Sequence, residues 1–224
     1  MKNIKLTTLL LFLLTFQLFS QENNTEKFKI GLNLGVNLFD INQNEFFDKY
    51  ESMISYTFGL SFEYKLNEKL SLISNINYDR KMMILEDYIS KDLDGNYFTI
   101  EDKLKFSYIN IPVLIRYYVG NKNKIFVNAG GFYNYSLNIE NDTTVNETGE
   151  DITLFDSENI LQKYDYGASL GIGFGFNLND KNHFSIELKD ELGLANIANY
   201  PNTSLTDLKT NTIKLILNWE LPIQ

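Results

Sequence analysis

The sequence contains no cysteine and only one histidine, His183, among its 224 residues. The absence of cysteine excludes disulfide bonds, thiolate metal sites, a cysteine nucleophile and a lipidated N-terminal cysteine. Enzymes that activate a nucleophile most often use a histidine base. His183 lies between Asn182 and Phe184 in a predicted turn, with no serine evidently paired with it. We therefore interpret His183 as a solvated turn residue, and we expect no enzymatic activity.

Positive charge is also scarce. The chain has 20 Lys and Arg residues against 29 Asp and Glu residues, which gives a net charge of −9. Nucleic-acid binding depends on cationic contacts to phosphate, so an acidic chain of this kind is not expected to bind nucleic acid.

The only long apolar run is near the N-terminus, from about Leu9 to Phe19. This run is too short to span a bilayer, and it follows Lys2 and Lys5 and precedes the small residue Ser20. The pattern predicts a signal peptide over residues 1–20. We expect residues 21–27 to form a short N-terminal segment and residues 28–224 to form one domain, because about 200 residues suit a single domain.

Apolar and polar residues alternate strictly from Phe28 to Leu38, which is the period of a β-strand with two contrasting faces. Similar alternation recurs seven more times along the chain. The further predicted strands are 54–65, 70–82, 104–119, 125–139, 165–178, 184–196 and 210–221. The sequence thus predicts eight strands.

The segment DYGASLGIGFGFNL at 165–178 contains Gly171, Gly173 and Gly175, which raises the possibility of a dinucleotide-binding loop. Such a loop ends a strand, opens a helix and carries its third glycine three residues after the second. Here Phe176 occupies that third position, the alternation continues through the glycines, and no helical period follows. We interpret the glycines as one face of a strand.

Three observations favour a barrel with its apolar face outward. Nine of the 13 glycines lie on the polar face, where small residues suit the narrow interior of an eight-stranded barrel. Aromatic residues cluster at both ends of the apolar face, as expected for two membrane girdles. We assign Tyr56, Tyr108, Tyr133, Tyr135 and Tyr166 to one girdle, and Phe62, Tyr64, Tyr117, Phe176, Phe184 and Trp219 to the other.

The connections between strands alternate in length, which is the third observation. Short turns follow the second, fourth and sixth strands, whereas the joins at 39–53, 83–103, 140–164 and 197–209 are long. Short periplasmic turns and long external loops are typical of outer-membrane barrels.

The predicted fold class is therefore all-β, an eight-stranded antiparallel up-and-down transmembrane β-barrel in the cell outer membrane. Closure is required because hydrocarbon cannot satisfy an open sheet edge. We expect a monomer surrounded by outer-membrane lipid and lipopolysaccharide. The alternative is a soluble periplasmic lipocalin-like barrel, which would have a polar exterior.

Charged residues of both signs occur at positions that should face the lumen. They are Glu63, Lys65, Asp79, Arg116, Glu187, Lys189, Glu191, Lys214 and Glu220. Mixed signs in a confined interior predict paired ions that plug the barrel, since an unpaired buried charge is costly. Glu187 and Glu191 could alternatively be read as paired catalytic carboxylates, but we favour the salt-bridged plug. Pro112, at a lumen position, predicts a bulge or a local break in its strand.

The long loops offer no clear ligand site. DLDGN at 92–96 resembles a calcium loop only in part, because it lacks the third ligand position and the spaced glutamate. Phe46, Phe47, Tyr50 and Met53 are expected either to form a short amphipathic turn or to cap the barrel rim. We predict no catalytic residue, no metal ligand, no cofactor-binding residue and no cofactor.

SYINIPVLIRYYVG at 107–120 and IELKDELGLANI at 186–197 resemble two signatures of the PorT-like outer-membrane β-barrel family of Bacteroidetes. The resemblance implies an integral outer-membrane protein, and the founding member is associated with type IX secretion. Two functions remain open. The protein is an accessory of protein secretion or envelope assembly with protein partners, or it is a structural or adhesion barrel whose acidic external loops bind surface ligands.

Overall fold

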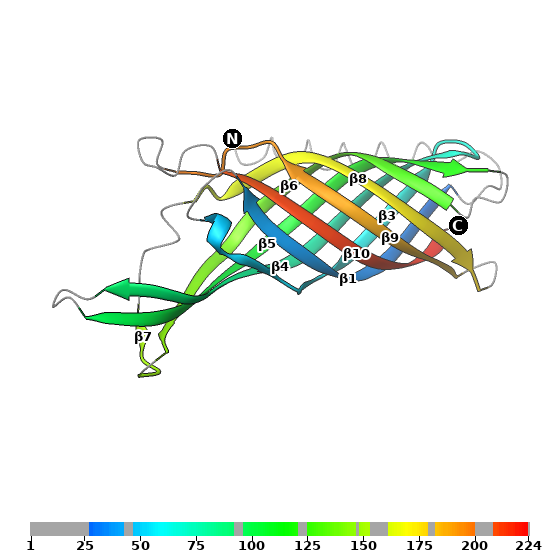
Figure 1. Ribbon diagram of the computed structural model, residues 1–224. Coiled ribbons are helices and arrows are strands. Elements are labelled where there is room, and N and C mark those ends of the chain that lie inside the picture. Colours follow the sequence, from blue (N-terminus) through cyan, green and yellow to red (C-terminus); the bar gives the residue numbers. More distant parts are fainter. Residues whose placement is uncertain are drawn as a thin grey trace, which may run out of the picture.

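The computed structural model describes residues 27–42, 47–91, 96–120, 125–146, 148–152, 161–178, 182–199 and 208–223. The predicted signal peptide at 1–20 and most of the short segment after it lie outside these residues. Eight long strands form a barrel (Figure 1). They are β1 (Phe28–Asn42), β3 (Ser55–Lys65), β4 (Leu70–Lys91), β5 (Tyr97–Val119), β6 (Ile125–Val145), β8 (Tyr164–Asn177), β9 (His183–Gly193) and β10 (Lys209–Ile223).

Every long strand pairs antiparallel with its neighbours in the sequence, so the barrel has the predicted up-and-down topology. The first and last strands close the ring, with a continuous ladder from Phe28 opposite Ile223 to Asn42 opposite Lys209. This closure leaves the wall of the barrel without an open edge. Backbone groups that face hydrocarbon therefore have partners inside the protein.

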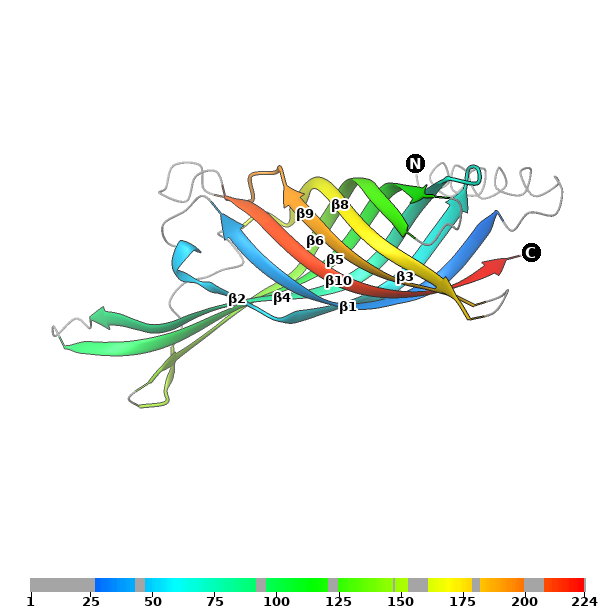
Figure 2. The same cartoon turned by 45° about the vertical axis from the view of Figure 1, so that its right-hand side comes forward.

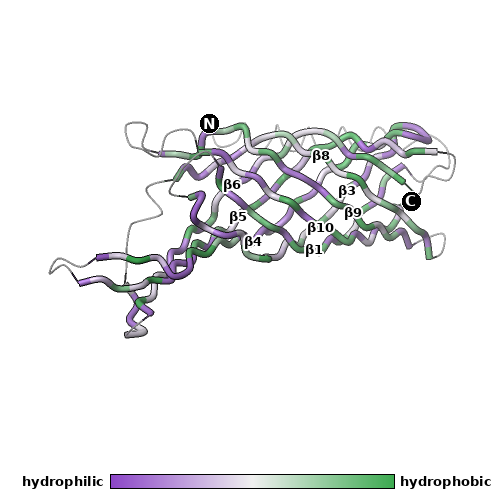
Figure 3. The backbone as a smooth tube through the Cα atoms, in the orientation of Figure 1, coloured by the Kyte–Doolittle hydropathy of each residue, from purple (hydrophilic) through white to green (hydrophobic). Residues whose placement is uncertain are grey.

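The apolar face of each strand points outward. Leu34, Ile172 and Leu217 are 60%, 56% and 56% exposed, whereas inward side chains such as Asn33 and Ser169 are buried. Figure 3 shows the resulting alternation of hydrophilic and hydrophobic residues along the strands. An exterior of leucine, isoleucine and valine requires lipid, which excludes the soluble lipocalin-like alternative.

The inward glycines provide space for neighbouring strands and side chains. A Cβ atom on Gly173 would come within 2.2 Å of the ring of Phe126, and one on Gly171 would come within 2.4 Å of the carboxylate of Glu187. Residues 165–177 lie within strand β8, where Gly171 and Gly173 pair with β6 and β9 and Gly175 pairs with β9, which excludes a phosphate-binding loop at these glycines.

Three strands continue beyond the barrel as a projecting sheet that we call the arm (Figure 2). The arm consists of the end of β4, the beginning of β5 and the end of β6, with the short strand β7 (Asp151–Ile152) paired to β6. These segments were predicted to be loops at 83–103 and 140–164, and that prediction is wrong over most of the described residues. A β-bulge between Leu85 and Tyr88, with Asp87 at a φ of 50°, interrupts the alternation by which the strands are recognised.

A second bulge, in β6, changes the face assigned to Ile139. In β6 the register shifts between Ser136 and Asn138, so Leu137 is an extra residue and Ile139 points inward instead of outward. Tyr108 is also buried rather than part of the outer girdle. It shares the inward face of β5 with Asn110, and its ring stacks against Phe106 inside the barrel.

Pro112 lies on the inward face, as predicted. The ladder between β4 and β5 stops at Ser74 opposite Val113 and resumes at Asn77 opposite Asn110, with no shift of register. Proline has no N–H to donate, so the distortion is a local break and not a bulge.

The helical part of the described chain is the 3-10 helix η1 (Phe47–Lys49), followed by the short strand β2 (Glu51–Met53), which pairs with β4. None of the helices in the described ranges is long and apolar enough to cross a membrane.

We expect Gly173→Ala to destabilise the barrel by about 1–3 kcal/mol, because the added methyl group would clash with the ring of Phe126. The control is Ala168→Val, which adds carbon atoms on the outward face of the same strand. Urea unfolding in lipid vesicles measures both variants. Equal unfolding midpoints for Gly173→Ala and the wild type would contradict the packing described here.

Candidate functional site

The centre of the lumen contains an ion cluster around Lys214. Its ammonium group lies 2.6 Å from Asp79 Oδ2 and 2.8 Å from Glu191 Oε2, and all three side chains are buried. The hydroxyl of Thr57 donates to the second carboxylate oxygen of Asp79 at 2.6 Å. One lysine is therefore shared by two acids in the interior of the barrel. We call this group the Lys214 cluster.

A second cluster lies nearer the end of the barrel that carries the short turns. Arg116 is 3.6 Å from Glu63 and 3.9 Å from Glu187, and its Nε donates to Asn128 Oδ1 at 3.0 Å. The guanidinium group also lies 4.0 Å from the ring centroid of Phe126. These contacts surround the buried Arg116 with acceptors and an aromatic face.

A chain of amides crosses the lumen beside the Lys214 cluster. Side-chain hydrogen bonds connect Asn33 to Asn77, Asn77 to Asn110, Asn110 to Asn134 and Asn134 to Asp165, at 2.8, 3.2, 2.7 and 3.2 Å. Asn110 also donates to Glu191 at 3.2 Å, which joins the amides to the ions. Together these contacts link strands β1, β4, β5, β6, β8 and β9 across the interior.

The opposite end of the lumen, where the long connections lie, is closed by apolar side chains. We call this cluster the lid. Its members are Phe39, Ile41, Phe47, Tyr50, Met83, Leu85, Leu104, Phe106, Tyr108, Ile139, Leu161, Ile197, Ala198 and Leu208. Lys81 lies directly beneath the lid, with its ammonium 4.9 Å from the ring centroid of Phe39 and 5.0 Å from that of Tyr108.

The lid includes the aromatic residues that were expected in the first loop. Phe47 and Tyr50 are buried against the rim and cap it, and η1 forms the short turn that was the alternative. Met53 is half-buried in β2, whereas Phe46 lies outside the described residues. The hydroxyl of Tyr50 donates to Asp102. Burial, together with this carboxylate, raises the pKa of Tyr50 well above its usual value.

Most of the predicted lumen charges are inside the barrel. Those that are buried are Glu63, Asp79, Arg116, Glu187, Lys189, Glu191, Lys214 and Glu220, whereas Lys65 is half-buried at the end of β3. The sequence interpretation missed Lys81 and Asp165, which are also buried. Both could have been recognised from the alternation of inward and outward residues along a strand, since Lys81 is two residues after Asp79 and Asp165 is on the same face as Gly167.

Glu187 and Glu191 each lie beside buried basic side chains. Glu187 lies 3.6 Å from Lys189 as well as near Arg116, and Glu191 lies against Lys214. Each carboxylate is therefore the counter-ion of a buried cation, as the plug interpretation predicted. His183 is the first residue of β9, at a short turn, and its Nδ1 is 2.7 Å from Asn177 Oδ1.

Within the described ranges, no group of three or more His, Asp or Glu side chains is arranged to hold a metal ion. The partial calcium motif DLDGN cannot be placed, because residues 92–95 lie outside those ranges.

Aromatic side chains mark both ends of the outer surface. Phe176, Phe184 and Trp219 stack in series near the short turns, and Trp219 Nε1 donates to Asn182 Oδ1 at 2.9 Å. Tyr56, Tyr133, Tyr135 and Tyr166 are exposed near the opposite end. Apart from Tyr108, the two predicted girdles are therefore present on the outside of the barrel.

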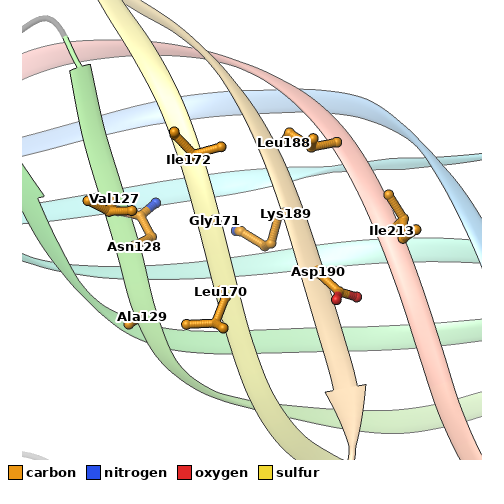
Figure 4. Close-up of a pocket in the computed structure, with 10 residues that line it drawn as sticks. All are labelled: Val127, Asn128, Ala129, Leu170, Gly171, Ile172, Leu188, Lys189, Asp190 and Ile213. Carbon is orange, nitrogen blue, oxygen red and sulfur yellow. The ribbon is translucent and has the colours of Figure 1, made fainter.

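Two shallow hollows lie on the outer wall. One, of about 530 Å³, is bordered by the aromatic stack near the short turns. The other, of about 470 Å³, lies across β6, β8, β9 and β10 (Figure 4). The lining of this second hollow includes the small residues Ala129 and Gly171. Asp190 also lines it, among Leu170, Leu188 and Ile213.

A closed antiparallel ring with an apolar exterior, aromatic girdles and a charged, filled interior defines an integral outer-membrane β-barrel protein. Residues 19–199 match the family described as outer membrane protein beta-barrel domain, and the chain belongs to this family. The protein is therefore located in the outer membrane.

Several solved outer-membrane proteins are similar in fold. The attachment invasion locus protein Ail of Yersinia pestis is 11% identical with a TM-score of 0.41, covering 87% of this chain and 99% of its own. Neisserial surface protein A is 10% identical (TM-score 0.42, 90% and 100% covered), and OprG of Pseudomonas aeruginosa is 16% identical (TM-score 0.41, 87% and 94% covered). No curated protein sequence matches this chain.

We predict that Lys214→Met destabilises the barrel by about 3–5 kcal/mol, because it leaves Asp79 and Glu191 buried without their shared cation. The triple variant Lys214→Met, Asp79→Asn, Glu191→Gln should recover most of this loss, since the charges are then removed together. Urea unfolding in lipid vesicles gives the three free energies. If Lys214→Met is as stable as the wild type, the Lys214 cluster does not stabilise the barrel.

Proposed function

We propose that this protein is a non-enzymatic accessory of protein secretion or envelope assembly, which presents its arm outside the membrane as a docking surface for partner proteins. The arm is the observation that carries the proposal. It continues the barrel wall as a regular hydrogen-bonded sheet, with β4 and β5 paired as far as Lys91 opposite Tyr97. The resemblance of 107–120 and 186–197 to the PorT-like family supports the same role.

The arm lies at the end of the barrel that carries the long connections, which faces the cell exterior in outer-membrane barrels. One edge of β4 pairs with β5 along the arm. On its other edge, among the described residues, β4 pairs with β2 only as far as Ile84. The edge beyond Ile84 therefore offers backbone donors and acceptors to an added strand. Ile89 and Tyr97, which are 65% and 74% exposed, supply apolar contacts beside that edge.

Charged residues of both signs lie along the arm and at its base, with acids in excess. Lys103 pairs with Glu101, Lys105 pairs with Asp142, and Arg80 pairs with Glu140. Further acids of the arm, Glu86, Asp87, Glu150 and Asp151, leave it with an excess of negative charge, which suits a partner protein with a basic surface. The alternative, an adhesion barrel that binds a surface ligand, is an outcome of the test below.

The interior supports a function on the surface and not in a pore. The ion clusters and the amide chain cross the lumen, and the lid covers its outer end. The interior of an eight-stranded barrel is just wide enough for side chains to fill it.

We expect removal of the arm tip to abolish partner binding and leave the barrel folded. Leu85 and Asp102 are opposite each other, so Asn-Gly in place of residues 86–101 can join them as a two-residue hairpin. The double variant Glu101→Ala, Lys103→Ala is the control, because it removes a half-buried ion pair on the arm and keeps the strand edge.

The proteins that co-purify from outer-membrane fractions in mild detergent are identified for each form. Secretion or envelope proteins should accompany the wild type and the control but not the shortened form. A wild-type barrel that purifies alone and binds a cell-surface ligand would replace the accessory role with the adhesion role.

We also expect the full-length protein to form no steady ion channel in planar bilayers, because its lumen is filled and its outer end is covered. Single-channel recording over a range of voltages measures this. Reproducible conductance steps of one size would contradict the plugged interior.

A further inference from the structure

Asp190 is an ionisable residue on the lipid-facing side of the barrel. Along the outward face of β9 it lies between Leu188 and Leu192, and across the sheet it is opposite Leu170 on β8 and Ile213 on β10. The outward charges Arg80 and Glu140, in contrast, lie where the barrel meets the arm and pair with each other at 2.6 Å. Asp190 is thus surrounded in all four directions by apolar side chains.

The carboxylate of Asp190 has no hydrogen bond or ion pair with any residue that the structure describes, and its Oδ1 atom is shielded from solvent. A charged or polar group in this position destabilises a barrel in lipid, so it is not explained by folding. Ionisable residues at membrane depth are usually paired, and they mark functional sites.

The depth of Asp190 limits what could pair with it. Phe184, in the girdle near the short turns, is six residues earlier on the same strand. With a rise of about 3.3 Å per residue and a tilt of about 40°, this places Asp190 about 15 Å above that girdle, in an apolar band about 25 Å tall. Lipid headgroups, which carry the charges of a bilayer, lie at the interfaces and do not reach this level.

The geometry points to a lateral docking site in which Asp190 receives the lysine or arginine side chain of a membrane-embedded partner protein. The hollow of about 470 Å³ beside Asp190 offers space for such a side chain (Figure 4). Leu170, Leu188 and Ile213 line the hollow, and these apolar side chains suit the hydrocarbon part of a lysine or arginine side chain. The charged end of that side chain then lies against the carboxylate of Asp190. This inference rests on the proposed accessory role, since it requires a protein partner, and it places a second contact in the membrane.

The absence of cysteine allows a clean test in outer membranes of cells that produce the full chain. A single cysteine at Ile213, on the rim of the hollow, carries a photo-activated cross-linker. The control cysteine is at Val113 on β5, which is outward and on the opposite side of the ring. Each is combined with wild-type Asp190, Asp190→Asn or Asp190→Glu, and heat-modifiability on a gel reports whether each barrel is folded.

We expect a protein adduct from Ile213→Cys and not from Val113→Cys, with a lysine or arginine in the cross-linked segment of the partner. Asp190→Asn should reduce the adduct about tenfold or more, because the partner's cation loses its counter-ion, while Asp190→Glu should retain it. Asp190→Asn should also leave the barrel folded.

Four results would overturn the inference. The first two are adducts of equal yield at both positions and an adduct whose yield does not depend on the carboxylate of residue 190. The other two are an adduct formed only with lipid or with a second copy of this chain, and an Asp190→Asn variant whose barrel does not fold. If one of these results is found while envelope proteins still co-purify with the wild type and not with the shortened-arm form, only the lateral site is rejected. If envelope proteins do not co-purify in this arm-dependent way, the proposed accessory role is rejected on its own evidence.

Discussion

The pairing of β1 with β10 is the interaction on which the rest of the structure depends. Hydrocarbon offers no hydrogen-bond partner, so an unclosed sheet of this composition could not remain in a membrane. Closure converts an alternating sequence into two separate environments, an apolar exterior and a polar interior. The inward glycines follow from the same constraint, because a narrow ring leaves no room for a Cβ beside Phe126 or Glu187.

The narrow interior then decides what the inward charges do. Lys214 and Arg116 are enclosed and must be paired, and each lies among acids from other strands. The lid adds an apolar layer above them, with Lys81 under its aromatic rings. Because the interior is occupied, interactions with other molecules are left to the outer surface. The arm outside the membrane and the hollow beside Asp190 are two places where that surface departs from a plain barrel wall.

The barrel itself could be predicted from the sequence, because strict alternation, inward glycines and short turns all follow from local rules. The arm could not, since the bulge at Leu85 and Tyr88 breaks the alternation and the strand continues through residues that resemble a loop. The bulge at Leu137 likewise reversed the face of Ile139. At the site, the inward position of the lumen charges could be predicted from the alternation of residues along each strand. Their pairing, and the isolation of Asp190, depend on which strands are neighbours and in what register, which a single sequence does not specify.

The central claim is that one face of each strand meets lipid while the other is enclosed, and single cysteines along β10 test it most directly. Cysteines at Leu215 and Leu217 should react in intact outer membranes with a lipid-soluble maleimide and not with a charged one. Cysteines at the buried positions Ile216 and Asn218 should react with neither reagent until the protein is boiled. Labelling of Leu217→Cys by the charged reagent before boiling would contradict the account, because that face would then be in water.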